Sequence, residues 1–195
     1  TMKNFRMCSL CDEEFHDPSN RRFHAQPNAC SQCGPHVELW DSQGKCLARH
    51  EKALRKACEE IRKGKIIALK GIGGFQLIAD AGNEESVELL RIRKKRELKP
   101  FALMFPNLEA VREICDLNTT EAGLLESPES PIVLLRRSQK KHTLKIAAQA
   151  APDNPYLGIM LAYSPLHHLL MNEINFPIAA TSGNVSDEPI CIDER

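Results

Sequence analysis

Two C-x-x-C pairs constrain the fold of this chain more than any other feature of its sequence. Cys8 and Cys11 form the first pair, and Cys30 and Cys33 form the second. Each pair brings two thiolates on a tight turn to one cation at about 2.3 Å, and two pairs complete a tetrahedron with no open position. The polar, turn-rich segment around them cannot build a core of its own, so it needs a metal to fold. The spacing predicts one structural zinc ion bound by all four cysteines.

The other cysteines and the nearby histidines leave alternatives to this site. Two redox disulfides, or simply unrelated cysteines, are the competing interpretation of the pairs. Three histidines could replace a thiolate, although four cysteines already suffice: His16, His24 and His36. The four remaining cysteines are scattered singly and the sequence shows no secretory signal, which favours metal binding in a reducing compartment over a disulfide framework. We therefore expect a cytoplasmic protein.

The overall composition excludes some classes of protein. The 195 residues include 26 basic and 26 acidic side chains, so the formal net charge is zero. A neutral chain is a poor non-specific ligand for nucleic acid or anionic membrane, although a local basic patch is still possible. Apolar residues make up 42% of the chain, and no apolar run approaches the roughly 18 residues of a membrane helix. We expect a globular protein that does not enter a membrane.

Helix-like and strand-like segments alternate after about residue 50. Helices are expected at residues 53–61, 83–98, 108–115, 119–125 and 165–172, and strands at residues 66–69, 101–105, 131–135, 157–161 and 177–181. Such alternation predicts an α/β (α+β-like) twisted open sheet covered by helices. The expected organisation is a small zinc module, residues 1–45, followed by a larger domain, residues 46–195.

A glycine-rich segment, Lys70-Gly-Ile-Gly-Gly-Phe75, follows the first strand of the larger domain. Glycines in a loop after a strand let backbone N–H groups approach a phosphate, and Lys70 would add a positive charge there. The segment matches neither a Walker A loop nor G-x-G-x-x-G. A tight turn with a surface lysine is an equally good interpretation.

A basic run and a polar turn are the other candidate anion-binding segments. The run contains Arg91, Arg93, Lys94, Lys95, Arg96 and Lys99. These cations repel one another, which is easiest to tolerate if some face an anion, although a solvated helix face is the alternative. Nucleic-acid binding is disfavoured because no aromatic residue is interleaved. The turn, Thr181-Ser182-Gly-Asn184, follows the last strand and offers hydroxyl and amide groups to a phosphate or an acyl group. Together the three segments predict a nucleotide site.

Several motifs in this order resemble one known family. They are C8-S-L-C11, R21-R-F-H-A-Q-P-N-A-C30, C33-G-P35, K70-G-I-G-G-F75, R93-K-K-R96, L157-G-I-M-L161, S164-P-L-H-H168 and A180-T-S-G-N184. The first three resemble the second zinc finger of the HypF carbamoyltransferases, which act in the maturation of nickel–iron hydrogenases. The others resemble the YrdC-like domain of the same family, and the resemblance covers nearly the whole chain.

This resemblance implies an ATP-dependent carbamoyl transfer. In the family, carbamoyl phosphate is hydrolysed upstream, the YrdC-like domain joins carbamate to ATP as carbamoyl-adenylate, and a downstream domain passes the carbamoyl group to a cysteine thiol of a HypE-like partner. The implied catalytic residues are Lys70, Lys94 and Arg96, and the implied cofactor-binding residues are Lys70, Arg96, Thr181, Ser182 and Asn184. The implied cofactors are structural zinc, ATP and Mg²⁺.

Departures from the family pattern set further expectations. The basic motif lacks the proline that follows its arginine in YrdC relatives, because Glu97 stands there. The resemblance also implies a YrdC-like domain truncated at its C-terminus, so this length of chain is expected to be inactive on its own. A zinc-finger protein that binds nucleic acid, or a regulatory protein, through the basic helix is the alternative function.

Overall fold

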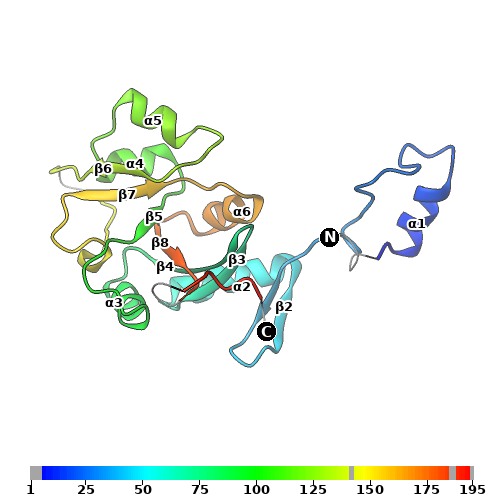
Figure 1. Cartoon of the computed structure of the whole chain (residues 1–195), viewed down its shortest axis with the longest axis horizontal. Helices are drawn as coiled ribbons and strands as arrows, with labels where there is room; N and C mark the ends of the chain where they lie inside the picture. The colour runs from blue at the N-terminus through cyan, green and yellow to red at the C-terminus, as the bar shows by residue number, and fades with distance from the viewer. Residues whose placement is uncertain (1–5, 141–142, 185–187, 194–195) are drawn as a thin grey trace. The chain divides into compact units, whose positions relative to one another are not determined.

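The computed structural model describes residues 6–140, 143–184 and 188–193. The chain divides into two compact units, Thr1–Leu54 and Arg55–Arg195, which are labelled by element in Figure 1. Among the described residues, no helix combines the length and apolar character needed to cross a bilayer.

The first unit holds one short helix and a two-stranded hairpin. Helix α1 spans Ser9–His16, and strands β1 (Glu38–Trp40) and β2 (Cys46–Arg49) pair antiparallel. The Glu38 carboxylate stabilises the hairpin. It accepts a hydrogen bond from the Trp40 indole at 2.6 Å and forms an ion pair with the Arg49 guanidinium at 3.2 Å. The sequence analysis did not anticipate these two strands.

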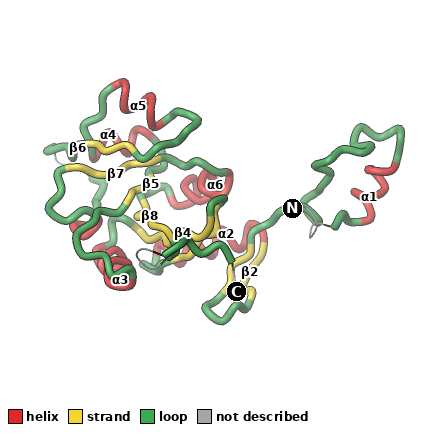
Figure 2. The backbone as a smooth tube through the Cα atoms, in the orientation of Figure 1, coloured by secondary structure: helices red, strands yellow, loops and turns green. Residues whose placement is uncertain are grey.

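The second unit is built on a six-stranded sheet, drawn in yellow in Figure 2. Its strands are β3 (Ile67–Gly71), β4 (Gly74–Asp80), β5 (Ala102–Met104), β6 (Val133–Arg136), β7 (Tyr156–Met160) and β8 (Ile178–Ser182). The sheet order is β3-β4-β8-β5-β7-β6, in which β5 and β7 are parallel and the other neighbours are antiparallel. The last strand in the sequence, β8, therefore occupies the middle of the sheet.

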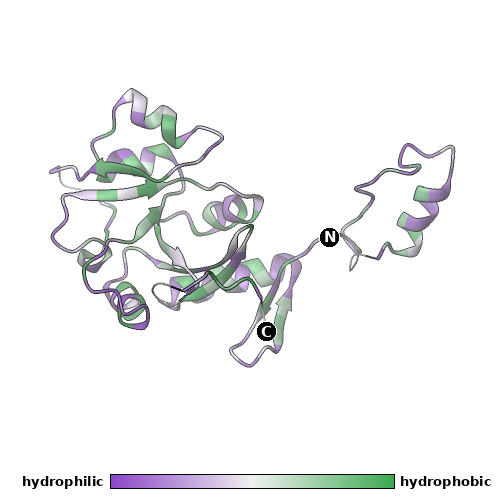
Figure 3. Cartoon of the chain, viewed as in Figure 1, coloured by the Kyte–Doolittle hydropathy of each residue, from purple (hydrophilic) through white to green (hydrophobic). Residues whose placement is uncertain are grey.

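Helices complete this unit, and the predicted fold class is confirmed. They are α2 (His50–Arg62), which begins in the first unit, α3 (Glu84–Arg93), α4 (Leu108–Ile114), α5 (Thr119–Leu125) and α6 (Pro165–Ile174). The main apolar core joins α3, α4 and α5 to one face of the sheet, with Phe101, Leu103 and Ile159 among its fully buried members. Figure 3 shows the hydrophobic residues gathered on these strands, while the helices carry both hydrophilic and hydrophobic residues.

Strand β4 corrects the interpretation of the glycine-rich segment. Residues 70–75 were expected to form a loop after a strand, but Lys70 pairs with Phe75 and Gly71 with Gly74, so they close a β-hairpin. Gly74 has a φ of +125°, a conformation that favours glycine. The residues after it, Phe75 to Asp80, continue β4, an interior strand that pairs with β3 and β8.

Helix α3 ends earlier than expected, and this separates the members of the basic run. The run was expected to lie within a helix to residue 98, but Lys95 takes a left-handed φ of +49° directly after the helix. The buried Arg91 guanidinium then donates hydrogen bonds to the carbonyls of Arg96, Glu97 and Lys99 at 2.8, 3.1 and 3.3 Å. Arg91 thus shapes the loop that follows instead of facing solvent.

Gly183, directly after β8, gives a test of how tightly the sheet end is packed. A Cβ there would lie 2.7 Å from the Phe75 Cβ and 2.9 Å from its carbonyl oxygen, so Gly183→Ala should lower the free energy of unfolding by about 1–3 kcal/mol. Gly73→Ala, where a Cβ would meet nothing within 4 Å, is the matched control. Urea unfolding measures both, and equal midpoints for the two variants would contradict this packing.

Candidate functional site

The four paired cysteines converge in the first unit. The Sγ–Sγ distances are 3.7 Å for Cys8–Cys30, 3.8 Å for Cys30–Cys33 and 3.6 Å for Cys11–Cys33. Four ligands at about 2.3 Å from a tetrahedral zinc ion would be about 3.8 Å apart, whereas a disulfide needs about 2.05 Å. The four predicted cysteines therefore form one cluster, and the spacing of their sulfur atoms fits a zinc ion.

Backbone groups prepare the sulfur atoms for a cation. Cys8 caps α1, which places Cys11 in the first turn of that helix. The second pair lies on a turn closed by the Gly34 N–H, which donates to the Cys30 carbonyl at 2.7 Å. Backbone N–H groups of Cys33 and Gln32 hold the pKa of the Cys30 thiol below its usual value, and the backbone of Cys30 and Cys8 lowers the pKa of Cys33 to about 6. These two thiols favour the thiolate form that binds metal, whereas burial raises the pKa of the Cys11 thiol.

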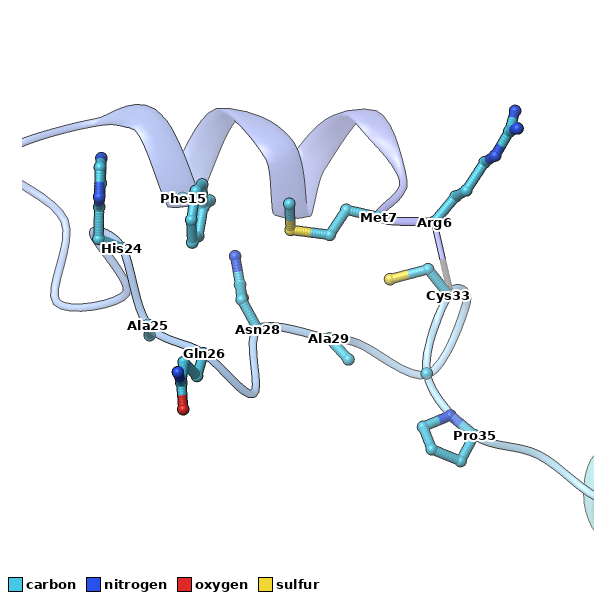
Figure 4. Close-up of a pocket in the computed structure, with 11 residues that line it drawn as sticks. Arg6, Met7, Phe15, His24, Ala25, Gln26, Asn28, Ala29, Cys33 and Pro35 are labelled. Carbon is cyan, nitrogen blue, oxygen red and sulfur yellow. The ribbon is translucent and has the colours of Figure 1, made fainter. Parts of the chain in front are cut away.

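A hollow of about 310 Å³ lies beside this cluster. Figure 4 shows Phe15, His24 and Asn28 around it, together with Cys33. The His24 ring stacks on Phe15 with centroids 5.0 Å apart, and Asn28 donates its amide to the Cys11 carbonyl at 2.6 Å. Among the described residues, the candidate ligand group consists of the four cysteines, so the histidines weighed as replacements lie outside it.

In the second unit, Lys94 contacts the predicted polar turn, whose first two residues, Thr181 and Ser182, belong to the end of β8. The Lys94 side chain is only 6% exposed, and the ammonium donates to the Ser182 carbonyl at 2.8 Å and to the carbonyl and side-chain oxygens of Asn184 at 2.5 and 3.0 Å. The Ser182 hydroxyl donates to the same Asn184 side chain at 2.5 Å. Burial, followed by repulsion from Arg96, lowers the pKa of Lys94. The two predicted segments therefore meet at one place.

Arg96 reaches the same strand from the loop after α3. Its guanidinium donates to the Thr181 hydroxyl at 3.2 Å and to the carbonyls of Lys99 and Pro100 at 2.8 and 2.5 Å. The guanidinium also lies 4.9 Å from the centroid of the Phe101 ring, a cation–π distance. This packing fixes a permanent cation beside Thr181.

A cleft of about 220 Å³ opens beside this turn. Its apolar lining comes from Phe75, Ala102, Ile132, Met160, Ala180 and Ile190, and its polar lining from Gln76, Tyr163, Thr181 and Ser182. Lys70, on β3, is exposed and holds its ammonium 5.8 Å from the Phe75 ring. Lys70 therefore lies near the cleft because it is close to Phe75, which lines it. Lys94 and Arg96 lie near the cleft because they contact Ser182 and Thr181, which also line it.

Sequence reasoning did not identify Gln76 or Tyr163 as part of this cleft. Gln76 stands on the strand that was not predicted, where it is the register partner of Ser182. Tyr163 immediately precedes the Ser164-Pro165 start of α6, and a single tyrosine before a helix carries no motif. The missing strand therefore explains why Gln76 was not identified, and the absence of a local motif explains Tyr163.

The residues around the cleft do not by themselves form a Mg²⁺ site. Mg²⁺ favours carboxylates and phosphate oxygens, and the residues that line the cleft include no carboxylate. The side-chain oxygen of Asn184, one of the expected cofactor-binding residues, already accepts a hydrogen bond from the Lys94 ammonium, which would compete with a metal cation. A magnesium ion fits here only as the companion of a bound phosphate.

Comparison with known proteins identifies relatives of both units of the chain. Residues 59–195 match the profile of the Sua5, YciO and YrdC proteins, described as "Telomere recombination", and residues 7–40 match the HypF finger. The carbamoyltransferase HypF of Synechocystis sp. is 49% identical over 95% of this chain and 30% of its own length. A crystal structure of full-length HypF in the phosphate- and nucleotide-bound form superposes with a TM-score of 0.80 at 46% identity, over 99% of this chain and 24% of that one. Threonylcarbamoyl-AMP synthase of Bos taurus is 24% identical over 70% of this chain and 49% of its own length.

The chain therefore belongs to the Sua5, YciO and YrdC family. The finger ahead of this domain and the identity over nearly the whole chain relate it to the HypF carbamoyltransferases, as the motifs predicted. The chain spans 30% and 24% of the length of two of these curated relatives.

The cysteine geometry predicts about one zinc ion per chain by elemental analysis. Cys30→Ser should lower the zinc content and expose the first unit to proteolysis, because metal binding replaces an apolar core there. The second unit should keep its cooperative unfolding, since the residues of its core lie between Ala79 and Ala179. Cys46→Ser, on β2 and outside the cluster, is the control. Full protease resistance of metal-free protein would contradict the role of the ion.

The Lys94 contacts predict a structural cost for losing one buried cation. Lys94→Met should lower the free energy of unfolding by about 1–3 kcal/mol, because the turn oxygens lose their donor. Lys95→Met removes the same charge from an exposed side chain and should change the free energy of unfolding by less than about 0.5 kcal/mol. Chemical denaturation measures both, and equal effects would show that Lys94 does not hold the turn.

Proposed function

We propose that this chain is the part of a HypF-type carbamoyltransferase that binds ATP and forms carbamoyl-adenylate from carbamate. Three relationships support this proposal: HypF proteins named as carbamoyltransferases match nearly the whole chain, a nucleotide-bound HypF shares its fold, and a more distant relative is named for making an acylated AMP. The zinc site stabilises the finger and takes no part in this chemistry, because four thiolates leave no open position.

One structural observation carries the proposal for the site. Lys94 and Arg96 converge on the Thr181–Asn184 turn at the edge of a mainly apolar cleft. Apolar walls suit a nucleoside, and hydroxyl and cationic groups at one end suit its phosphates. Lys70, on the neighbouring strand, adds an exposed ammonium that can reach a phosphate tail.

The formation of carbamoyl-adenylate requires that the protein position the two reactants and stabilise negative charge, rather than form a covalent bond with either of them. An oxygen of the carbamate carboxylate attacks the α-phosphorus of ATP and forms a new P–O bond. The bond from this phosphorus to the bridging oxygen breaks, and pyrophosphate leaves with the electron pair. Fixed cations stabilise the charge that develops on the leaving group, and a Mg²⁺ ion bound with the nucleotide would neutralise part of the same charge.

The proposal extends to partners and compartment. Carbamate would come from carbamoyl phosphate, and the adenylate would deliver its carbamoyl group to a cysteine thiol of a HypE-like protein. Four zinc-binding thiolates suit a reducing compartment, so we place the protein in the cytoplasm. The basic run supports nucleic-acid binding poorly, because Arg91 and Lys94 are buried and Arg96 donates inward to Thr181.

Calorimetric titration with ATP and Mg²⁺ tests the nucleotide site. Lys70→Met should weaken saturable binding about 10-fold, the loss of one charge-assisted contact. Lys65→Met removes an exposed lysine just ahead of β3 and should leave the affinity unchanged. Absence of saturable binding by the parent chain would contradict the proposed function, and equal affinity of all three proteins would remove Lys70 from the site.

A further inference from the structure

A chain of hydrogen bonds connects the cleft with a buried histidine of α6. The hydroxyl of Tyr163 lies 2.7 Å from the Gln76 side-chain nitrogen. The Gln76 side-chain oxygen lies 3.1 Å from His167 Nε2, and His167 Nδ1 lies 2.7 Å from the Ser164 hydroxyl. His167 is fully buried and packs under the Tyr163 ring, with centroids 4.4 Å apart.

The donor of each of these hydrogen bonds can be assigned from its neighbours. Burial, followed by repulsion from His168, lowers the pKa of His167, so its ring is neutral and carries one N–H. The ring contacts the Gln76 side-chain oxygen, which can only accept a hydrogen bond, so the single ring proton is on Nε2 and is donated to that oxygen. Nδ1 of the neutral ring then accepts the hydroxyl hydrogen of Ser164, whose oxygen also accepts the backbone N–H of His167.

The direction of these bonds determines what Tyr163 can do. Gln76 has its oxygen fixed by His167, so it presents its N–H to the phenol oxygen of Tyr163. A phenol oxygen that accepts a hydrogen bond from Gln76 keeps its own hydrogen for another acceptor. Tyr163 lines the cleft and is 36% exposed, so that hydrogen is available to a ligand there.

We propose that the Tyr163 hydroxyl donates a hydrogen bond to the carbamoyl oxygen of the acyl-adenylate, and that Gln76 and His167 position it. This assignment rests on the proposed function of the cleft. Gln76 and Ser182 are direct register partners on adjacent strands, which places their Cβ atoms about 5 Å apart. An α-phosphate at Ser182 would therefore carry its acyl group towards Tyr163.

Charge distinguishes the two ends of this site. The cations Lys94 and Arg96 contact the turn and Thr181, and they suit phosphate oxygens. The Tyr163 end is made of neutral groups, Gln76, Ser164 and a neutral His167. A neutral donor suits an uncharged carbonyl oxygen and would be a weak anchor for a phosphate.

A pair of ligands separates acyl recognition from nucleotide recognition. AMP carries no acyl group, whereas 5′-O-(N-carbamoylsulfamoyl)adenosine is a stable mimic that carries the carbamoyl group. By calorimetry on the whole chain, Tyr163→Phe should weaken the mimic about 5- to 10-fold and leave AMP within about 2-fold. Tyr156→Phe, at the start of β7 where the other tyrosine of the chain pairs with Arg136 of the edge strand β6, should change neither.

A double-mutant cycle tests the positioning role of Gln76. Gln76→Met should weaken the mimic as much as Tyr163→Phe does, and the double variant should be no weaker than either single one. A merely structural role would instead lower the affinity for AMP and add to the effect of Tyr163→Phe. Circular dichroism and urea midpoints verify that each variant is folded.

The outcomes separate this inference from the proposed function. If the parent chain binds neither ligand, the proposed function fails and the inference fails with it. If AMP and the mimic bind but Tyr163→Phe weakens neither, or weakens both equally, the nucleotide site stands and the acyl role of Tyr163 is overturned.

Discussion

The Lys94 ammonium is the point on which the geometry of the second unit depends. It stands at the end of α3 and donates to oxygens of Ser182 and Asn184 at the end of β8, so one side chain joins a helix end to a strand end. The three oxygens match the three N–H groups of an ammonium. Because the site is buried, water cannot replace a lost hydrogen bond, so each of them contributes to stability. The same contacts also place a cation beside Ser182, which lines the cleft.

Each of the two units is stabilised by a different kind of interaction. The second unit relies on apolar burial behind a sheet, with Phe101, Phe105 and Leu157 among the side chains removed from water. The first unit has few buried apolar side chains and depends on four sulfur atoms spaced for a metal ion. Its stability is therefore linked to the availability of a metal, whereas that of the sheet is not.

Much of this arrangement could be predicted from the sequence, because it depends on local signals. The cysteine spacing indicated the metal site, and helices were predicted at residues 108–115, 119–125 and 165–172, where the structure has α4, α5 and α6. Strand β4 was missed because the glycines before it resemble a phosphate loop as much as a hairpin turn. The roles of Arg91, Gln76 and Tyr163 could not be predicted, since each depends on a partner distant in sequence, as when Arg91 bonds the carbonyl of Gln149.

The place of β8 in the sheet has a consequence for how this protein is made. Its neighbours β4 and β5 are both synthesised earlier, yet they are joined to each other only through β8. While the chain emerges from the ribosome, these two strands present unpaired edges that can associate with other chains. The sheet is completed only when residues 178–182 become available, a contact pattern of long sequence separation that slows folding. A nascent chain of this kind gains most from protection by a chaperone in the interval before its last strand is released.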